Sequence, residues 1–170
     1  MKIDEITALV DDLDGVLTVR PGPGDGTPEI AWGDVFFYYA PDGVMPTTTQ
    51  PFATIVTKNY PDDEASRLDR PDAFRVNVAA GKDSFVHWTG HDPRAPAAST
   101  ATGPGTGTDA DADTDADDTV IAHPVYGSLG WLAVVNPGER TGAATRELLL
   151  KAHELARARY ERRSARSGEP

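Results

Sequence analysis

The chain has 170 residues, no cysteine, and 27 acidic against 16 basic side chains, a formal net charge of −11. The absence of cysteine excludes disulfides, thiolate metal sites and cysteine nucleophiles. No apolar run approaches the roughly 18 residues that span a membrane, and acidic residues stand where a signal peptide needs an apolar stretch, so we expect one cytoplasmic domain away from the membrane.

Helical and strand patterns follow one another through the first half of the chain. Apolar side chains at helical spacing predict a helix over Ile3–Leu13, which Gly15 ends. A second, short helix over Lys82–Trp88 stops at Gly90. The β-branched and aromatic runs predict strands at 16–20, 35–39, 52–57 and 73–78. In the last of these, alternation places Arg75 and Asn77 on the face opposite the apolar residues.

The second half of the chain begins with a change of composition. From about residue 91 to 118 the sequence is Ala, Thr, Pro, Gly and Asp, which predicts a disordered acidic insert. A last strand at 130–135 precedes a long helix that Thr141 caps and that runs to about Arg163, before a frayed basic tail at 164–170. Successive strands joined by short turns predict a single α+β domain over 1–170, an antiparallel sheet packed by the two outer helices.

Charge is unevenly distributed along the chain. From Glu139 onward there are eight basic and five acidic residues, which leaves eight basic and 22 acidic residues before that point. An acidic body repels phosphate backbones, so nucleic-acid binding is disfavoured for the molecule as a whole. Weak DNA contact through the basic C-terminal helix remains a third possibility.

The densest polar stretch follows the third predicted strand and ends in the fourth. Arginine forks bind carboxylate or phosphate in a bidentate way, so this stretch could form a cationic pocket in which Asp69 orients one arginine. The same residues could instead form a structural Arg–Asp network that pins the connection to the sheet, and we favour this interpretation. The candidate binding residues are Lys58, Tyr60, Arg67, Asp69, Arg70, Arg75 and Asn77.

His123 is the one candidate catalytic residue. It stands just before the last predicted strand, where a histidine could act as acid or base because its charge changes near neutral pH. It could equally be a loop histidine bonded to the backbone, and no partner is visible in the sequence. No pattern of metal ligands or nucleotide-binding glycines is convincing, so we expect no metal and no cofactor.

Three stretches carry a resemblance to a known family. They are the strings PEIAWGD at 28–34, FATIVTKNYP at 52–61 and SRLDRPDAFRVN at 66–77, with HPVY at 123–126, Trp131 and NPG at 136–138 in the same pattern. Together they resemble an uncharacterised bacterial domain-of-unknown-function family, DUF6194, over nearly the whole chain except the insert. A remoter similarity is to the small α+β domains of the MmcQ/YjbR type, a group linked loosely to DNA binding.

The resemblance implies no activity, so function is an expectation from the residues. We expect a non-enzymatic binding module for a small anionic ligand or a protein partner, centred on the polar stretch. The alternative is an enzyme in which His123 is the acid or base and the arginines hold a carboxylate or phosphate. The sequence leaves the ligand and the oligomeric state open.

Overall fold

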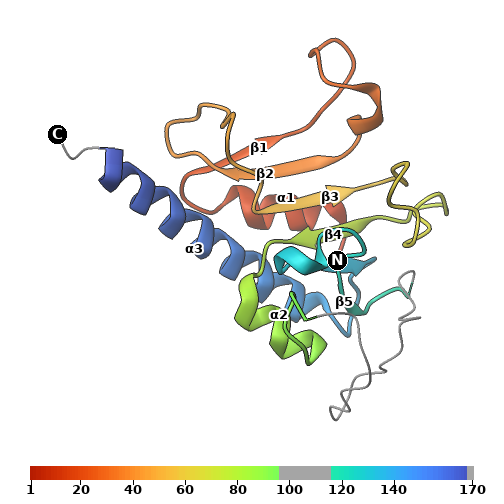
Figure 1. Cartoon of the computed structure of the whole chain (residues 1–170). Helices are drawn as coiled ribbons and strands as arrows, with labels where there is room; N and C mark the ends of the chain where they lie inside the picture. Colours follow the sequence, from red (N-terminus) through yellow and green to blue (C-terminus); the bar gives the residue numbers. More distant parts are fainter. Residues whose placement is uncertain (96–115, 168–170) are drawn as a thin grey trace.

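A six-stranded sheet with helices on one face makes up the protein, of which the computed structural model describes residues 1–95 and 116–167 (Figure 1). The strands lie in the order β1-β2-β3-β4-β6-β5, and every neighbouring pair is antiparallel. The strands are β1 (Val16–Val19), β2 (Val35–Tyr39), β3 (Ala53–Val56), β4 (Arg75–Val78), β5 (Val120–Ala122) and β6 (Leu132–Val135). The helices are α1 (Ile3–Asp11), α2 (Gly81–Thr89) and α3 (Gly142–Ser167), with 3-10 turns η1 (Glu29–Ala31) and η2 (Gly127–Leu129). The predicted α+β class, with an antiparallel sheet between a first and a last helix, is confirmed.

The core lies between the sheet and the three helices. Strand alternation sends every second side chain to this face, and the pairing of Ile55 with Val76 continues it from β3 to β4. The core side chains of the strands are Val35, Phe37, Ala53, Ile55, Val76, Val78 and Leu132. Those of the helices are Ile6, Val10, Phe85, Leu148, Leu149 and Ala152. The apolar faces predicted for the first and last helices are therefore the ones that are buried.

The opposite face of the sheet is covered in part by the chain connecting β3 to β4. Thr54 pairs with Asn77 and Val56 with Arg75, so two polar side chains of β4 stand on this face. Leu68 and Ala73 from the connection pack there against Val56 and Val135. A row of polar side chains consequently lies between a sheet and a loop, away from the main core.

The backbone just before α3 is bound by a carboxylate from another part of the chain. The Asp118 carboxylate accepts hydrogen bonds from the backbone N–H groups of Gly138, Arg140 and Thr141, at 2.7, 2.9 and 2.8 Å. It also accepts the Thr141 hydroxyl. Thr141 directly precedes Gly142, the first residue of α3, which is the position expected of a cap, but its hydroxyl donates to Asp118. The Asp118 carboxylate, just ahead of β5, therefore binds the backbone that leads into the helix.

Asp117 and Asp118 show that the predicted insert does not extend as far as residue 118. Asp117 forms an ion pair with Arg70 at 3.1 Å and accepts the Asn136 amide at 3.1 Å. Both Asp117 and Asp118 thus belong to the ordered fold, because each has polar partners that the composition of the stretch does not reveal. Residues 96–115, on which the prediction of disorder mainly falls, lie outside the described residues.

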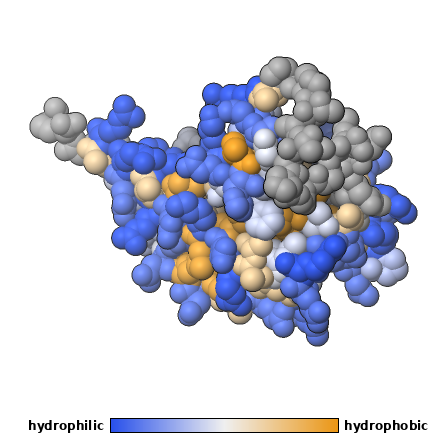
Figure 2. All heavy atoms as spheres, turned by 90° about the horizontal axis from the view of Figure 1, so that it is seen from below, coloured by the Kyte–Doolittle hydropathy of each residue, from blue (hydrophilic) through white to orange (hydrophobic). Residues whose placement is uncertain are grey.

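Two further elements differ from the sequence prediction. The strand β5 was not expected; it is three residues long and forms the edge of the sheet beside β6. Helix α3 continues to Ser167, so the tail expected to fray from 164 is helical at its start, and 168–170 lie outside the description. Both views show this end of α3 projecting from the body, with mostly hydrophilic residues (Figures 1 and 2). Over the described residues, no helix combines the length and the apolar character needed to cross a membrane.

Candidate functional site

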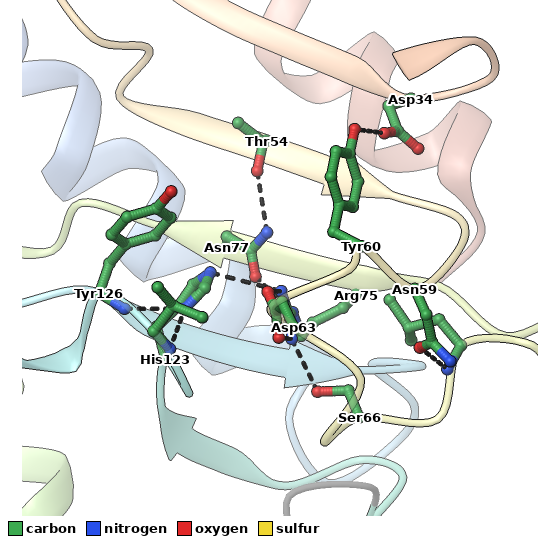
Figure 3. A network of polar contacts seen from close by, with 12 residues as sticks. Asp34, Thr54, Asn59, Tyr60, Asp63, Ser66, Arg75, Asn77, His123 and Tyr126 are labelled. Atoms are coloured by element: carbon green, nitrogen blue, oxygen red, sulfur yellow. Dashed lines mark hydrogen bonds and ion pairs between the residues drawn. The ribbon is translucent and has the colours of Figure 1, made fainter. Parts of the chain in front are cut away.

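Arg75 is the centre of the polar network on the second face of the sheet (Figure 3). Its side chain, on β4, is 2% exposed. The guanidinium donates to both carboxylate oxygens of Asp63, with Nη1 2.9 Å from Oδ1, and Nη1 also donates to the Ser66 hydroxyl at 2.8 Å. Its Nε donates to the Asn77 amide oxygen at 2.7 Å. A bidentate, charge-assisted pair of this kind holds the β3–β4 connection against the sheet.

Asn77 carries the network across to the neighbouring strand. Its amide nitrogen donates to the Thr54 hydroxyl on β3 at 2.9 Å, while its oxygen accepts from Arg75. All three side chains are buried. Each of these buried polar groups therefore has a partner inside the protein, as buried polar groups require.

His123 meets the network from the segment that follows β5. The backbone N–H groups of Val125 and Tyr126 both donate to its Nδ1, each at 3.1 Å, so the proton of the neutral ring is on Nε2. Nε2 lies 3.4 Å from a guanidinium nitrogen of Arg75. The ring is 4% exposed, and its burial, followed by the Arg75 charge, lowers the pKa of His123 to about 4, against an opposing effect of Asp63. His123 is a neutral, enclosed side chain at neutral pH.

A second polar cluster surrounds Asp34 at the end of the sheet where β2 begins. Asp34 is 1% exposed and accepts from the Thr57 backbone and hydroxyl at 2.8 and 3.0 Å, and from the Tyr60 hydroxyl. Lys58 lies 3.5 Å from the same carboxylate and donates to two carbonyls in and beside η1. Burial first, and then the Asp34 carboxylate, raise the pKa of Tyr60, so its hydroxyl stays protonated and donating. This cluster ties the loop before β2 to the end of β3.

The remaining predicted residues lie on the connection itself. Arg70 donates to the Arg67 carbonyl at 3.0 Å and pairs with Asp117. Asp69 is exposed, and within residues 1–95 and 116–167 no arginine is paired with it. The orienting role expected of Asp69 is taken by Asp63 toward Arg75. Several acidic residues stand in this stretch, and no sequence signal distinguishes Asp63 from its neighbours.

The structure thus divides the predicted set into three groups. Lys58 and Tyr60 bind Asp34, and Arg75 and Asn77 form the buried network that also contacts His123, whereas Arg67, Asp69 and Arg70 lie on the connection. The arrangement supports the interpretation of an arginine–aspartate network that fixes a loop, with a different aspartate from the one expected. In the part of the chain that is described, no three acidic or histidine side chains come together as metal ligands would.

An open groove lies at the opposite end of the sheet, where β2 and β4 end and β3 and β6 begin. We call it the α3 groove; it has a volume of about 310 Å³. Its lining residues are Tyr39, Thr48, Thr49, Gln50, Pro51, Phe52, Ala79, Leu129, Trp131, Ala156, Arg159 and Arg163. The sequence prediction missed this site, because its residues come from five separate segments and carry no recognisable motif.

The comparisons with known proteins give one result. A family model described as a family of unknown function, DUF6194, matches residues 1–165. The chain belongs to this family. No curated protein and no solved structure matches the chain. Membership in DUF6194 accounts for the resemblance seen in the sequence, whereas the similarity to MmcQ/YjbR-like domains is not confirmed and stays a prediction.

Proposed function

We propose that this DUF6194 chain is a non-enzymatic ligand-binding domain and that its ligand binds in the α3 groove. The observation that carries the proposal is the contrast between the two ends of the sheet. At one end the polar side chains are buried and bonded to one another. At the other end the groove is open and has a cationic side chain, Arg159, on its wall.

The alternative of an enzyme with His123 as acid or base finds less support in the geometry. A general base needs a free lone pair within reach of the proton that it removes. Here Nδ1 accepts two backbone N–H groups, and Nε2 carries the proton and faces the Arg75 guanidinium. The nearest cation is Arg75, and both of its terminal guanidinium nitrogens donate to Asp63. It therefore has no free pair of donors for a substrate carboxylate or phosphate.

DNA contact through α3 is the weaker third proposal. The exposed arginines of its last turns favour it, and the acidic body opposes it. Duplex DNA therefore belongs among the compounds tested, at low salt, where a contact of this kind is strongest.

The first prediction concerns the position of the ligand. A panel of small anions, neutral compounds and duplex DNA is added to the ¹⁵N-labelled full chain, and amide chemical shifts are recorded. We expect the shifts that change on binding to gather at Thr48–Phe52 and around Arg159. Gln50→Trp, which fills the groove from an exposed position, should weaken binding about tenfold or more, and Glu147→Trp on the exposed side of α3 should not. Changes gathered around Asp63, Ser66 and Arg75, with none at Thr48–Phe52, would contradict the proposal.

A further inference from the structure

The floor and the rim of the α3 groove differ in chemistry. Its floor is apolar, because the side chains of Phe52 and Trp131 and the methyl group of Ala79 are almost fully buried beneath it. Leu129 extends this apolar surface into solvent, with 66% of its area exposed. A ligand with an apolar body would cover the exposed part of this surface, most of which belongs to Leu129, and the gain is proportional to the area covered.

The rim is polar and positively charged. Thr48, Thr49 and Gln50 stand on one side of the groove and Arg159 on the other. Among the described residues, no hydrogen bond or ion pair involves the Arg159 guanidinium, whereas Arg157 on the same helix is bonded to Glu161 at 2.8 Å. A guanidinium beside hydroxyl and amide groups binds carboxylate or phosphate oxygens.

The dimensions suit a small ligand and leave room for a longer one. A volume of about 310 Å³ is at the lower end for small-molecule sites. A second hollow of about 440 Å³ adjoins the groove and shares Tyr39, Thr48, Thr49 and Arg163 with it. The exposed apolar side chains Val44 and Met45 line this second hollow. An apolar body can therefore continue from the groove along the inner side of the β2–β3 connection.

We infer that the α3 groove binds a small amphiphilic anion, with an aromatic or aliphatic body on the Phe52–Trp131–Leu129 floor and one carboxylate or phosphate group at Arg159. The inference rests on the proposed function and names the class of its ligand. A purely polar anion would leave the Leu129 side chain in water, and a purely apolar compound would desolvate Arg159 without giving it a partner. Only a ligand that has both an apolar body and an anionic group covers the apolar floor and also pairs with Arg159.

Two fluorescent dyes with the same ring system separate these cases. 1-Anilinonaphthalene-8-sulfonate carries an anionic group, and N-phenyl-1-naphthylamine is its uncharged counterpart. Each is titrated into the folded full chain at neutral pH, with inorganic phosphate as a competitor that has no apolar body. We expect the sulfonate dye to bind at least tenfold more tightly than the neutral dye, and phosphate to displace it only weakly.

Three variants test the charged rim and the apolar floor separately. Arg159→Gln should weaken the sulfonate dye about tenfold and leave the neutral dye unchanged, since it removes one charge-assisted contact. Arg162→Gln removes the same charge from an exposed position that does not line the groove, and it should change neither dye. Leu129→Ser should weaken both dyes, and its high exposure makes loss of folding a poor explanation.

The outcomes distinguish this inference from the function on which it rests. Equal affinity for the two dyes, with no effect of Arg159→Gln, would overturn the amphiphilic class while leaving a ligand site in the groove. Equal loss of the sulfonate dye in Arg159→Gln and Arg162→Gln would show a general charge effect and overturn the role of Arg159. Dye-induced shift changes away from Thr48–Phe52 and Arg159 would overturn both proposals.

Discussion

Arg75 holds a permanent charge in the interior of the protein, and Asp63 is its counter-charge. Removal of one partner of a buried pair leaves the other desolvated and uncompensated, which costs about 3–5 kcal/mol. We therefore expect Asp63→Ala to lower the free energy of unfolding by about 3 kcal/mol, measured by urea denaturation. Asp62→Ala, at the exposed neighbouring position, should change it by less than about 0.5 kcal/mol. Equal effects of the two variants would show that the pair does not hold the connection.

The buried His123 side chain predicts how the stability of the protein depends on pH. Its pKa is about 4 in the folded protein and about 6.5 in an unfolded chain, so between these values the unfolded state binds more protons. The free energy of unfolding should therefore fall as the pH decreases from about 6.5 toward 4, by about 3 kcal/mol in total. His123→Asn keeps an acceptor for the two backbone donors and removes the titrating group, so its stability should depend less on pH in this range.

The pH range identifies the group responsible. Asp118 also has a lowered pKa: burial opposes its charge, but the hydrogen bonds from the Thr141 hydroxyl and from three backbone N–H groups outweigh that effect. A depressed carboxyl pKa loses its stabilisation only as the pH falls below about 3.8. Urea midpoints measured between pH 7 and 4.5 therefore report on His123 and not on Asp118. A slope unchanged in His123→Asn would disprove the assignment.

At the level of elements, the beginning of α3 depends on a side chain from another segment. Asp118 adopts a left-handed backbone conformation, with φ of 55°. Asparagine tolerates that conformation, so Asp118→Asn removes the charge and one acceptor without backbone strain. We expect a loss of about 1.5 kcal/mol in the free energy of unfolding, the lower end of the net value of a hydrogen bond to a charged group. Glu139→Gln, which removes the same charge from an exposed neighbouring position, should be nearly neutral, and a loss as large as that of Asp118→Asn would argue against the role of these hydrogen bonds.

The elements that could be predicted from the sequence are those with a local signal. Helices α1 and α3 have apolar residues at helical spacing, and β2, β3 and β4 have β-branched or aromatic runs. Strand β5 has only three residues, and its position depends on pairing with β6, which a local pattern does not contain. The binding of Asp118 to the backbone before α3 was missed for the same reason, because the carboxylate lies 20 and 23 residues before its partners Gly138 and Thr141.

The candidate site was less predictable than the fold. Alternation in β4 correctly placed Arg75 and Asn77 on one face, and the structural role favoured for the arginines agrees with the buried network. Which acid meets which arginine depends on the path of the connection through space, so Asp63 could not be chosen over Asp69. The groove assembles residues from both halves of the chain, and only the folded molecule brings them together.

At the scale of the whole molecule, the two ends of the sheet have different roles. One end is held by buried ion pairs and hydrogen bonds between a loop and the strands. The other carries the groove, and α3 extends beyond it with its exposed arginines (Figure 1). From Glu139 onward basic residues outnumber acidic ones by eight to five, so this helix opposes the repulsion that the acidic body exerts on a diffusing anion.

The strand order has a consequence for how the chain can be divided. Residues 1–95 contribute β1, β2, β3 and β4, and residues from 116 onward contribute β6 and β5, so each part supplies an unbroken block of the sheet. A cut in the chain between residues 95 and 116 would therefore leave all the strand pairs within each block intact. Among the described strands, β4 and β6 form the pair that joins the two parts, and α3 adds to it by packing on β2, β4 and α1. The position is therefore suited to splitting the protein into complementing fragments, or to receiving an inserted domain.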